Sequence, residues 1–356
     1  MRLLYITDRL SYRGGAPHHL LDLIHQVADE HELTVAAADR DSDVELPRTV
    51  RFVRCRAIRS GRELEESALP ALVEAADGVH LQNVMQPAVL SAVTGPKAIV
   101  TVQDHRVFCP GPGKTLPSGQ ACDDPMGPAV CGVCISDEAD RAERLALTSA
   151  RLEAIKQAGR VVVLSHYMAG ALHQLGVHPV EVIPPPVPLG PQRTAAGEGF
   201  LVAGRLVHHK GTDIAVEAFR VASPSSSLSV AGLGPVELGN AQALGWLDRP
   251  TLRAHLAQAR ALLFPARWQE PFGIVGVEAL AMGTPVVAMV RGGMVDWADV
   301  GTLAVSGVDE MAASISYLQH HPEEALSLGR EGQLAVAKRF SPRDHFRRVL
   351  ALYQGL

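Results

Sequence analysis

The chain has 356 residues, of which 47% are hydrophobic and 20% are charged, and this composition excludes a disordered chain and fits a protein with sizeable cores. The net charge of −5 gives no overall attraction for nucleic acid, so we expect no nucleic-acid partner. No apolar run approaches the length of a membrane span, and the chain meets Asp8 too early for a signal peptide, which predicts a cytoplasmic protein.

Short apolar runs alternate with helical patterns along the first half of the chain. Such alternation favours βαβ units and parallel sheets. The expected strands are residues 3–7, 33–38, 78–81, 98–102 and 161–164. Gly14 and Gly15 fall between the first strand and the first helix, expected over residues 17–28. We interpret these glycines as a point of close approach to a ligand, with a plain turn as the alternative.

Six arginines and no acidic residue lie between Arg48 and Arg62. The alternation within residues 51–56 suits a strand with one polar face. The other interpretation is a site for an anionic acceptor or for a membrane surface with acidic lipids.

Four of the five cysteines lie in a Gly/Pro-rich insertion, residues 109–134: Cys109, Cys122, Cys131 and Cys134. In a cytoplasmic chain this pattern favours a metal site over disulfides. We expect a structural zinc ion, with an iron–sulfur cluster as the second choice and no metal as the third. Cys55 lies apart and is predicted to be a core or strand residue.

Five prolines lie within the nine residues from Ile183 to Pro191. Such a run cannot lie inside a helix or strand, so it predicts a linker between an N-terminal domain, residues 1–187, and a C-terminal domain, residues 188–340. The second domain is expected to contain strands at residues 200–203, 227–231, 261–264 and 285–288. In open parallel sheets, ligands bind beyond the carboxyl ends of the strands.

Glu270 and Glu278 lie eight residues apart, and a Pro-Phe-Gly turn follows the first. The pattern predicts a helix over residues 275–282 and a buried strand over residues 284–288. Gly273 lets the backbone approach a ligand, and the helix N-terminus offers free N–H groups. Two carboxylates beside an anion-binding helix end suit a ligand with many hydroxyls and a phosphate, such as a nucleotide sugar. Solvated surface charge is the alternative.

This run resembles the E-x7-E signature of retaining glycosyltransferases of the GT-B fold, most closely the GT4-type family. The resemblance covers nearly the whole chain through Gly14-Gly15-Ala16, Gly204-Arg205-Leu206 with Lys210-Gly211, Gly232-Leu233-Gly234-Pro235 and Gly292-Gly293. It implies an α/β chain with two Rossmann-like domains facing each other across a cleft. The N-terminal domain would bind the acceptor and the C-terminal domain the nucleotide sugar. A last helix, residues 341–356, would pack back on the N-terminal domain.

The resemblance also implies roles for single residues. Arg205 and Lys210 would neutralise the diphosphate, so that catalysis needs no metal cofactor. Glu278 would accept hydrogen bonds from the ribose, and Glu270 would contact the transferred sugar. Further contacts with the nucleotide sugar are expected at Gly15, Gly204, Gly234, Phe272, Gly273 and Ile274.

One position departs from the family pattern. Gln103 stands where the family has a histidine near an outer hydroxyl of the sugar. A glutamine can donate and accept hydrogen bonds but cannot titrate. Gln103 stays among the catalytic candidates, and His105 is the alternative.

The expected function is retaining hexosyl transfer from a nucleotide diphosphate sugar, with UDP as the expected nucleotide. The acceptor would be a small molecule, a glycan or a lipid-linked group, with weak peripheral contact to a membrane. Other readings are a GT-B epimerase or phosphorylase, and a metal- or redox-sensing binding protein that uses the four cysteines on a GT-B scaffold. Retention of both glutamates with Arg205 and Lys210 favours an enzyme.

Overall fold

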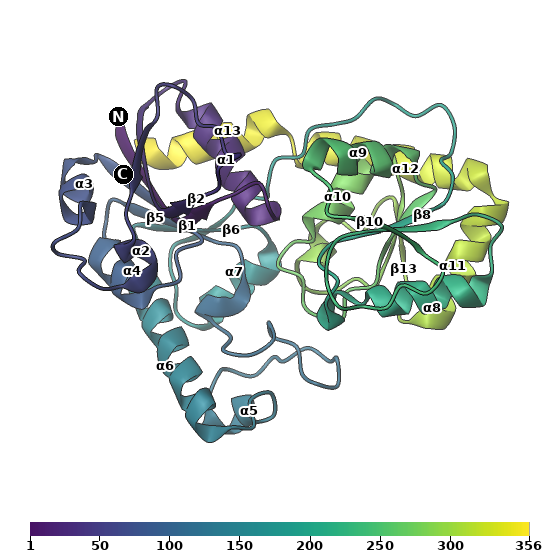
Figure 1. The fold of residues 1–356 in the computed structure, drawn as a ribbon, viewed down its shortest axis with the longest axis horizontal. Coiled ribbons are helices and arrows are strands. Elements are labelled where there is room, and N and C mark those ends of the chain that lie inside the picture. Colours follow the sequence, from purple (N-terminus) through teal and green to yellow (C-terminus); the bar gives the residue numbers. More distant parts are fainter. Residues whose placement is uncertain (356) are drawn as a thin grey trace. The chain divides into compact units, whose positions relative to one another are not determined.

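The computed structural model describes residues 1–355, which divide into two compact units (Figure 1). Unit 1 contains Met1–Pro184 and the C-terminal segment from Arg343, and unit 2 contains Pro185–Pro342. From the sequence, the boundary between the two domains is expected after residue 187, and in the structure the first segment of unit 1 ends three residues earlier, at Pro184. Within residues 1–355, none of the helices combines the length and the hydrophobicity that a membrane span requires.

Unit 1 is built on a parallel sheet of seven strands in the order β3-β2-β1-β4-β5-β6-β7. Its strands are β1 (Arg2–Leu10), β2 (Glu32–Arg40), β3 (Arg51–Arg54), β4 (Gly78–Gln82), β5 (Ala98–Val102), β6 (Arg160–Val163) and β7 (Val180–Val182). Its helices are α1 (Gly15–Val27), α2 (Ala57–Ser60), α3 (Leu69–Ala75), α4 (Pro87–Val93), α5 (Pro128–Gly132), α6 (Glu138–Ile155), α7 (His166–Gln174), α13 (Pro342–Gln354) and the 3-10 helix η1 (His105–Val107).

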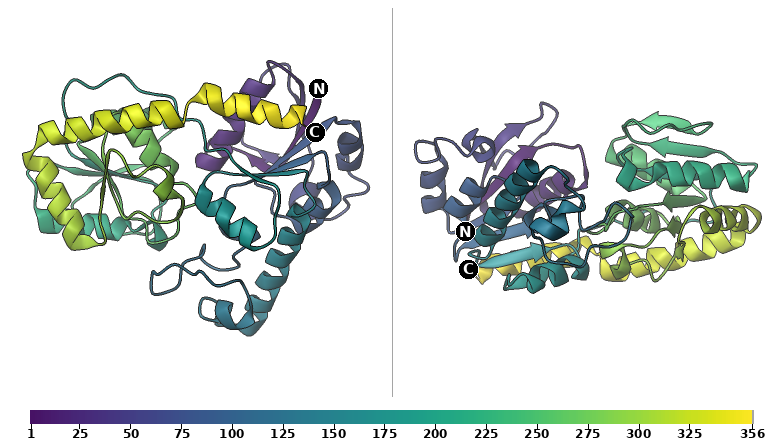
Figure 2. Two further views of the ribbon diagram at one scale, coloured as in Figure 1. Left: turned by 180° about the vertical axis from the view of Figure 1, so that it is seen from behind. Right: turned by 90° about the horizontal axis from the view of Figure 1, so that it is seen from below.

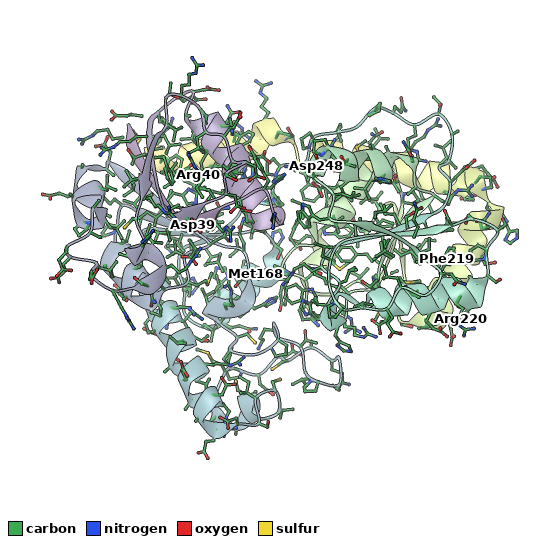
Figure 3. The ribbon with its side chains drawn as sticks, viewed as in Figure 1. Asp39, Arg40, Met168, Phe219, Arg220 and Asp248 are labelled. Carbon is green, nitrogen blue, oxygen red and sulfur yellow. The ribbon has the colours of Figure 1, made fainter. Side chains whose placement is uncertain are left out.

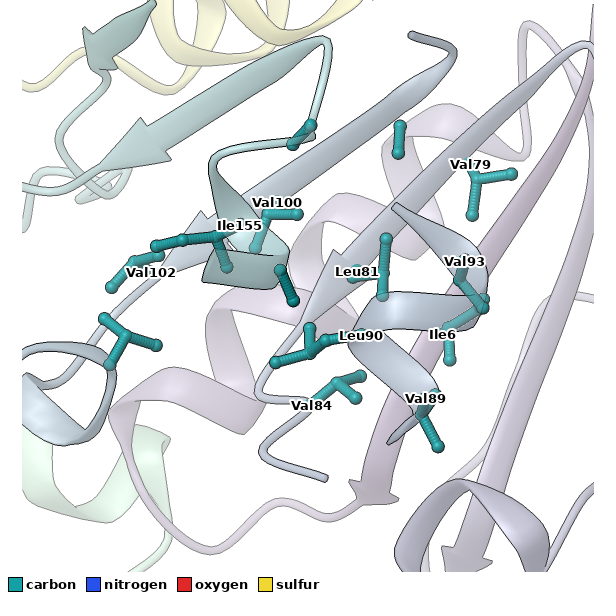
Figure 4. Close-up of a cluster of buried hydrophobic side chains, with 14 of the residues drawn as sticks. Ile6, Val79, Leu81, Val84, Val89, Leu90, Val93, Val100, Val102 and Ile155 are labelled. Carbon is teal, nitrogen blue, oxygen red and sulfur yellow. The ribbon is translucent and has the colours of Figure 1, made fainter. Parts of the chain in front are cut away.

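Both faces of this sheet are covered, as parallel sheets require. On one face, aliphatic side chains of the strands meet α4 and α6 in the cluster of Figure 4, which includes Ile6, Val79, Leu81, Val84, Val89, Leu90, Val93, Val100, Val102 and Ile155. On the other face, α1 and α13 pack against the sheet, and Figure 2 shows the two helices side by side. The last helix therefore completes the core of the unit in which the chain begins.

Unit 2 contains a parallel sheet of six strands in the order β10-β9-β8-β11-β12-β13. Its strands are β8 (Phe200–Ala203), β9 (Leu228–Ala231), β10 (Gln242–Gly245), β11 (Ala261–Phe264), β12 (Val286–Ala288) and β13 (Thr302–Ala304). Its helices are α8 (Thr212–Ala222), α9 (Arg249–Gln258), α10 (Ile274–Ala281), α11 (Val308–His320), α12 (Pro322–Arg339), and the 3-10 helices η2 (His208–Lys210) and η3 (Gly292–Asp296). In Figure 1, α8 and α11 cover one face of this sheet, and α9, α10 and α12 cover the other.

Helix α8 shows how sequence pattern fixes the packing of these helices. Phe219 and Arg220 are adjacent in the chain and are both labelled in Figure 3. The ring of Phe219 contacts that of Phe200 in β8 at a centroid distance of 6.1 Å. Arg220 pairs instead with Glu217 at the exposed surface. One face of the helix is therefore held against the sheet and the other is solvated.

The sequence pattern predicts β5, β8 and β11 with the bounds observed, and the helix expected over residues 275–282 is α10. The alternation of residues 51–56 corresponds to β3. Strands β7, β10 and β13 are not predicted, because each has only three or four residues and no continuous apolar run. All strand pairs found in the described residues are parallel, as the alternation of strands and helices predicts.

Candidate functional site

The loop before α10 passes through a backbone conformation that favours glycine. Gly273 caps this helix with φ 81°. A Cβ atom there would lie 3.1 Å from Phe264 Cε1 and 3.2 Å from Met294 Cγ. Any larger residue would meet both strain and crowding. The tight turn after Gly273 sets the first turn of α10, whose N–H groups lack partners within the helix.

Glu270 is a buried carboxylate, with 3% of its surface exposed. Its Oε1 accepts hydrogen bonds from Lys210 Nζ and from Trp268 Nε1, both at 2.6 Å. The Lys210 ammonium also lies 4.9 Å from the centre of the Trp268 ring. On the backbone side, Gly293 N–H donates to the Glu270 carbonyl at 2.6 Å. The loop of Glu270 is therefore fixed by groups from two other segments.

Glu278 lies within α10 and is also buried, with 6% exposed. Its Oε1 accepts from Arg249 Nε at 2.9 Å. Arg249 begins α9, a helix capped by the Asp248 side chain. Arg253, one turn further along α9, carries a second cation close enough for the Glu278 charge to act on its pKa. Arg249, which the sequence reasoning missed, thus compensates the charge of a buried carboxylate.

The loops after β8 and β9 lie against each other where the sequence predicts glycine contacts. A Cβ on Gly232 would lie 1.9 Å from the Gly204 carbonyl oxygen, and one on Gly234 would lie 2.0 Å from that of Leu206. These glycines are required by the close approach of two backbones. Gly211 is required for the same reason, since a Cβ added there would lie 1.9 Å from the Pro265 carbonyl oxygen.

The pKa of His209 shows which charged side chains lie near Glu270. Burial lowers the pKa of this imidazole first, and the cations of Lys210 and Arg205 lower it further, while Glu270 raises it. The predicted residues Arg205, Lys210 and Glu270 therefore share one neighbourhood. His209 Nε2 is buried without a hydrogen-bond partner, and its ring lies 4.7 Å from that of Trp268. Sequence reasoning missed His209, although it directly precedes Lys210.

The remaining predicted contacts fall in both units. Phe272 is buried, and its carbonyl accepts from Trp297 Nε1 at 2.6 Å. Ile274 is the first residue of α10. Gly15 begins α1 in unit 1, directly after Gly14, whose φ is 104°.

Gln103 lies in unit 1, inside a buried chain of hydrogen bonds. His345 Nδ1 donates to the Pro184 carbonyl at 2.8 Å, and burial lowers the pKa of this histidine to about 4. Its Nε2 is therefore an acceptor, which lies 3.1 Å from His19 Nε2. His19 Nδ1 then accepts from Gln103 Nε2 at 2.7 Å. The chain closes as Gln103 Oε1 accepts from Gln82 Nε2 at 3.2 Å.

Both ends of the Gln103 amide are thus occupied within unit 1. The side chain is held by α1, β4 and, through His345, by α13. His105, the alternative candidate, is also buried, and its Nε2 lies 3.1 Å from the Tyr167 hydroxyl. Burial lowers its pKa to about 4.

The four clustered cysteines are free thiols in the structure. The Lys114 N–H donates to Cys109 Sγ at 3.2 Å, and the space beside Gly111 touches both Cys109 Sγ and Cys134 Sγ. Burial raises the pKa of the Cys134 thiol, and Cys109, Cys122 and Cys131 add to that increase. Among the described residues, no group of three or more Cys, His, Asp or Glu side chains is arranged to hold a metal ion.

The region that contains Glu270 and Glu278 is similar to a known protein family. Residues 196–334 match the family described as glycosyl transferases group 1. The glycogen synthase of Mycobacterium tuberculosis is 30% identical over 167 residues, which cover 42% of this chain and 40% of that protein. The D-inositol 3-phosphate glycosyltransferase of Segniliparus rotundus is 32% identical over 239 residues, 56% of this chain and 53% of the relative. These matches span about half of each relative or less.

Solved structures with the same fold cover the whole chain. Sucrose-phosphate synthase from Thermosynechococcus elongatus superposes with a TM-score of 0.72 at 18% identity, over 99% of this chain and 98% of that one. HepE from Anabaena, solved in complex with UDP and glucose, gives 0.72 at 17% identity over 99% of both chains. The protein therefore has the GT-B fold, and its residues 196–334 are similar to glycosyl transferases group 1.

Proposed function

We propose that the protein transfers a hexose from a UDP-sugar to an acceptor hydroxyl, with retention at the anomeric carbon and without a catalytic metal. The observation that carries this proposal is the pair of buried carboxylates, Glu270 and Glu278, at either side of the start of α10. Each accepts a hydrogen bond from a cation, Lys210 or Arg249. They lie in the segment that matches the glycosyltransferase family.

The cations of this site suit a leaving diphosphate. Lys210 donates one hydrogen bond to Glu270 and retains two further N–H donors. Arg205 lies in the same loop, and its guanidinium offers the planar fork that matches phosphate oxygens. Together with the N-terminus of α10, they would stabilise the negative charge that develops as the sugar–phosphate bond breaks. His209 adds a buried ring nitrogen beside them.

The two glutamates would hold the neutral parts of the donor. Glu278, inside the helix, would accept from the ribose hydroxyls, and Glu270, before the Gly273 turn, would contact the transferred hexose. Because ion pairs fix both carboxylates, little reorganisation is needed when the donor binds. Retention would follow from attack on the same face that the diphosphate leaves, with a phosphate oxygen accepting the proton of the acceptor hydroxyl.

A related protein supports the assignment of the donor. HepE was solved in complexes with UDP and with UDP-glucose. We assign the UDP-sugar to unit 2, which contains Glu270, Glu278 and the matched residues 196–334, and the acceptor to unit 1. The comparisons give no support to a sensing protein that uses the cysteines.

The test is UDP release from UDP-glucose with glucose, glycerol or myo-inositol as acceptor. We expect Glu270→Gln to lower the rate on the order of 10²–10³-fold, because it removes an interaction that acts at the reacting sugar. Glu217→Gln, an exposed carboxylate of the same unit, is the matched control and should leave the rate unchanged. Equal rates in wild type and Glu270→Gln would refute the proposed role of this residue.

We further propose that Cys109, Cys122, Cys131 and Cys134 together bind a zinc ion, with an iron–sulfur cluster as the second choice. The support is that Cys109 Sγ and Cys134 Sγ both lie beside Gly111, and that the other three thiols act on the pKa of Cys134. Metal analysis of the purified protein should lose its signal in Cys131→Ser and keep it in Cys55→Ser. Unchanged metal content in Cys131→Ser would remove that ligand.

A further inference from the structure

The carboxyl ends of β1 and β4 carry polar groups that the fold itself does not satisfy. These strands are neighbours, and their register pairs Ile6 with Leu81. The same register continued by two residues places Asp8 beside Asn83. Both Asp8 Oδ1 and Asn83 Nδ2 are buried and have no hydrogen-bond partner. Burying such atoms unpaired costs about 1–3 kcal/mol each, so their retention calls for a reason.

Local geometry brings the Asp8 side chain close to the turn that contains Asn83. The Asp8 carboxyl receives a hydrogen bond from the Met85 N–H, within the turn that starts at Asn83. Asn83 itself has φ 60°, a left-handed conformation that asparagine adopts more readily than most other residues.

The two unpaired atoms have opposite hydrogen-bonding character. Asp8 Oδ1 accepts and Asn83 Nδ2 donates, yet they do not bond to each other. A hydroxyl group can donate to the first and accept from the second at the same time. No other single uncharged group of a sugar does both. The next residues back, Thr7 and Gln82, also carry buried oxygens without partners, Thr7 Oγ1 and Gln82 Oε1.

Charge around Asp8 keeps it able to accept. Burial raises the pKa of this carboxyl to about 6, while Arg106, Arg59 and Arg151 act in the opposite direction. The guanidinium of Arg59 also donates to the Asp8 carbonyl at 3.2 Å. At neutral pH the group is therefore mostly ionised, and a hydroxyl donating to it would form a charge-assisted hydrogen bond.

We propose that Asp8 and Asn83 form the binding site for a hydroxyl of the acceptor, and that the acceptor is a polyol. This assignment rests on the proposed glycosyl transfer and names the substrate class of unit 1. Asp8 accepts the hydrogen bond of the hydroxyl and Asn83 donates to its oxygen.

The experiment measures binding of glucose, glycerol, myo-inositol and their monophosphates to the full chain with saturating UDP, by saturation-transfer NMR. Asp8→Asn keeps the shape but removes the charge, and Asn83→Gly removes the amide while glycine tolerates the positive φ. Asp39→Asn is the control, because that carboxylate, at the end of β2 (Figure 3), already pairs with Arg54.

The proposal predicts that wild type binds at least one of these probes and that both variants bind it about tenfold or more weakly. UDP affinity and the denaturation midpoint should not fall in either variant, which separates lost binding from lost folding. Binding of no polyol by wild type, or equal binding by wild type and both variants, would overturn it. Failure of wild type to bind UDP would instead refute the proposed donor site.

Discussion

The two sheets present different chemistry where their strands end. In unit 2, the buried carboxylates Glu270 and Glu278 each meet a cation within 3 Å. In unit 1, Asp8 and Asn83 each leave a buried polar atom without a partner, and burial lowers the pKa of the histidines His80 and His345. Balanced charges suit a site prepared for an anionic ligand, whereas unsatisfied polar atoms indicate that an uncharged ligand completes the site.

The largest effect is expected when one of the buried carboxylates of unit 2 loses its cation. Arg249→Ala removes the cation 2.9 Å from the buried Glu278. We expect a loss of about 3 kcal/mol in the free energy of unfolding, since a buried carboxylate loses its closest cation. Urea denaturation measures this. The control Arg220→Ala, on an exposed pair, should leave the transition unchanged, and an equal effect of both variants would argue against a balanced buried site.

The second prediction concerns ligand rather than fold. Lys210→Ala should weaken UDP binding about 10- to 100-fold, because a charged hydrogen bond to phosphate is lost. Calorimetry gives the dissociation constants. Lys338→Ala, an exposed lysine on α12 of the same unit, is the matched control. Unchanged affinity in Lys210→Ala would place the diphosphate elsewhere.

The Gly273 turn provides the third prediction. Gly273→Ala forces a side chain into φ 81° and against Phe264, so we expect destabilisation of about 1–3 kcal/mol. Gly307 caps α11 with an extended backbone and open space around its Cβ position. Gly307→Ala should therefore be tolerated. Similar denaturation midpoints for the two variants would show that the turn is not constrained.

The smallest expected effect comes from Asp8 and depends on pH. Its folded-state pKa of about 6 exceeds the ordinary 3.8, so the folded state binds more protons between these values and this carboxyl destabilises the fold as pH rises through that window. Asp8→Asn should be more stable than wild type by about 1–2 kcal/mol at pH 7, after allowance for the partly exposed side chain. The difference should vanish near pH 4.

The buried histidines of unit 1 act with the opposite sign. Burial lowers the pKa of His80 to about 3 and that of His345 to about 4, so acid destabilises the fold below the ordinary value of 6.5. Wild type and Asp8→Asn share this contribution of the histidines. It therefore cancels when the stabilities of the two proteins are compared at the same pH. A variant less stable than wild type at pH 7 would contradict the assignment of Asp8 to ligand binding.

The sequence predicts the parts of this molecule that depend on local pattern. The strands β5, β8 and β11 are apolar runs bounded by polar loops, and Gly273 lies between a carboxylate and a helical pattern. The match of residues 196–334 confirms the family resemblance of this half.

Partners that lie far apart in the chain could not be predicted. Arg249 precedes Glu278 by 29 residues and no motif links them. His80 looks like a residue of a buried strand, and its partner Tyr353 is 273 residues away. In the sequence, Asp8 is only an acidic residue that follows an expected strand. That its Oδ1 lacks a hydrogen-bond partner depends on how β1 meets β4 and on the conformation of Asn83, which the sequence pattern does not give.

Calorimetric titration with UDP, GDP and ADP, in wild type and in Glu278→Gln, tests the central claim most directly. The account predicts micromolar binding of UDP by wild type and a loss of about tenfold or more in the variant, because the ribose would lose a charged acceptor. Binding of no nucleotide, or the same UDP affinity in both proteins, would contradict it.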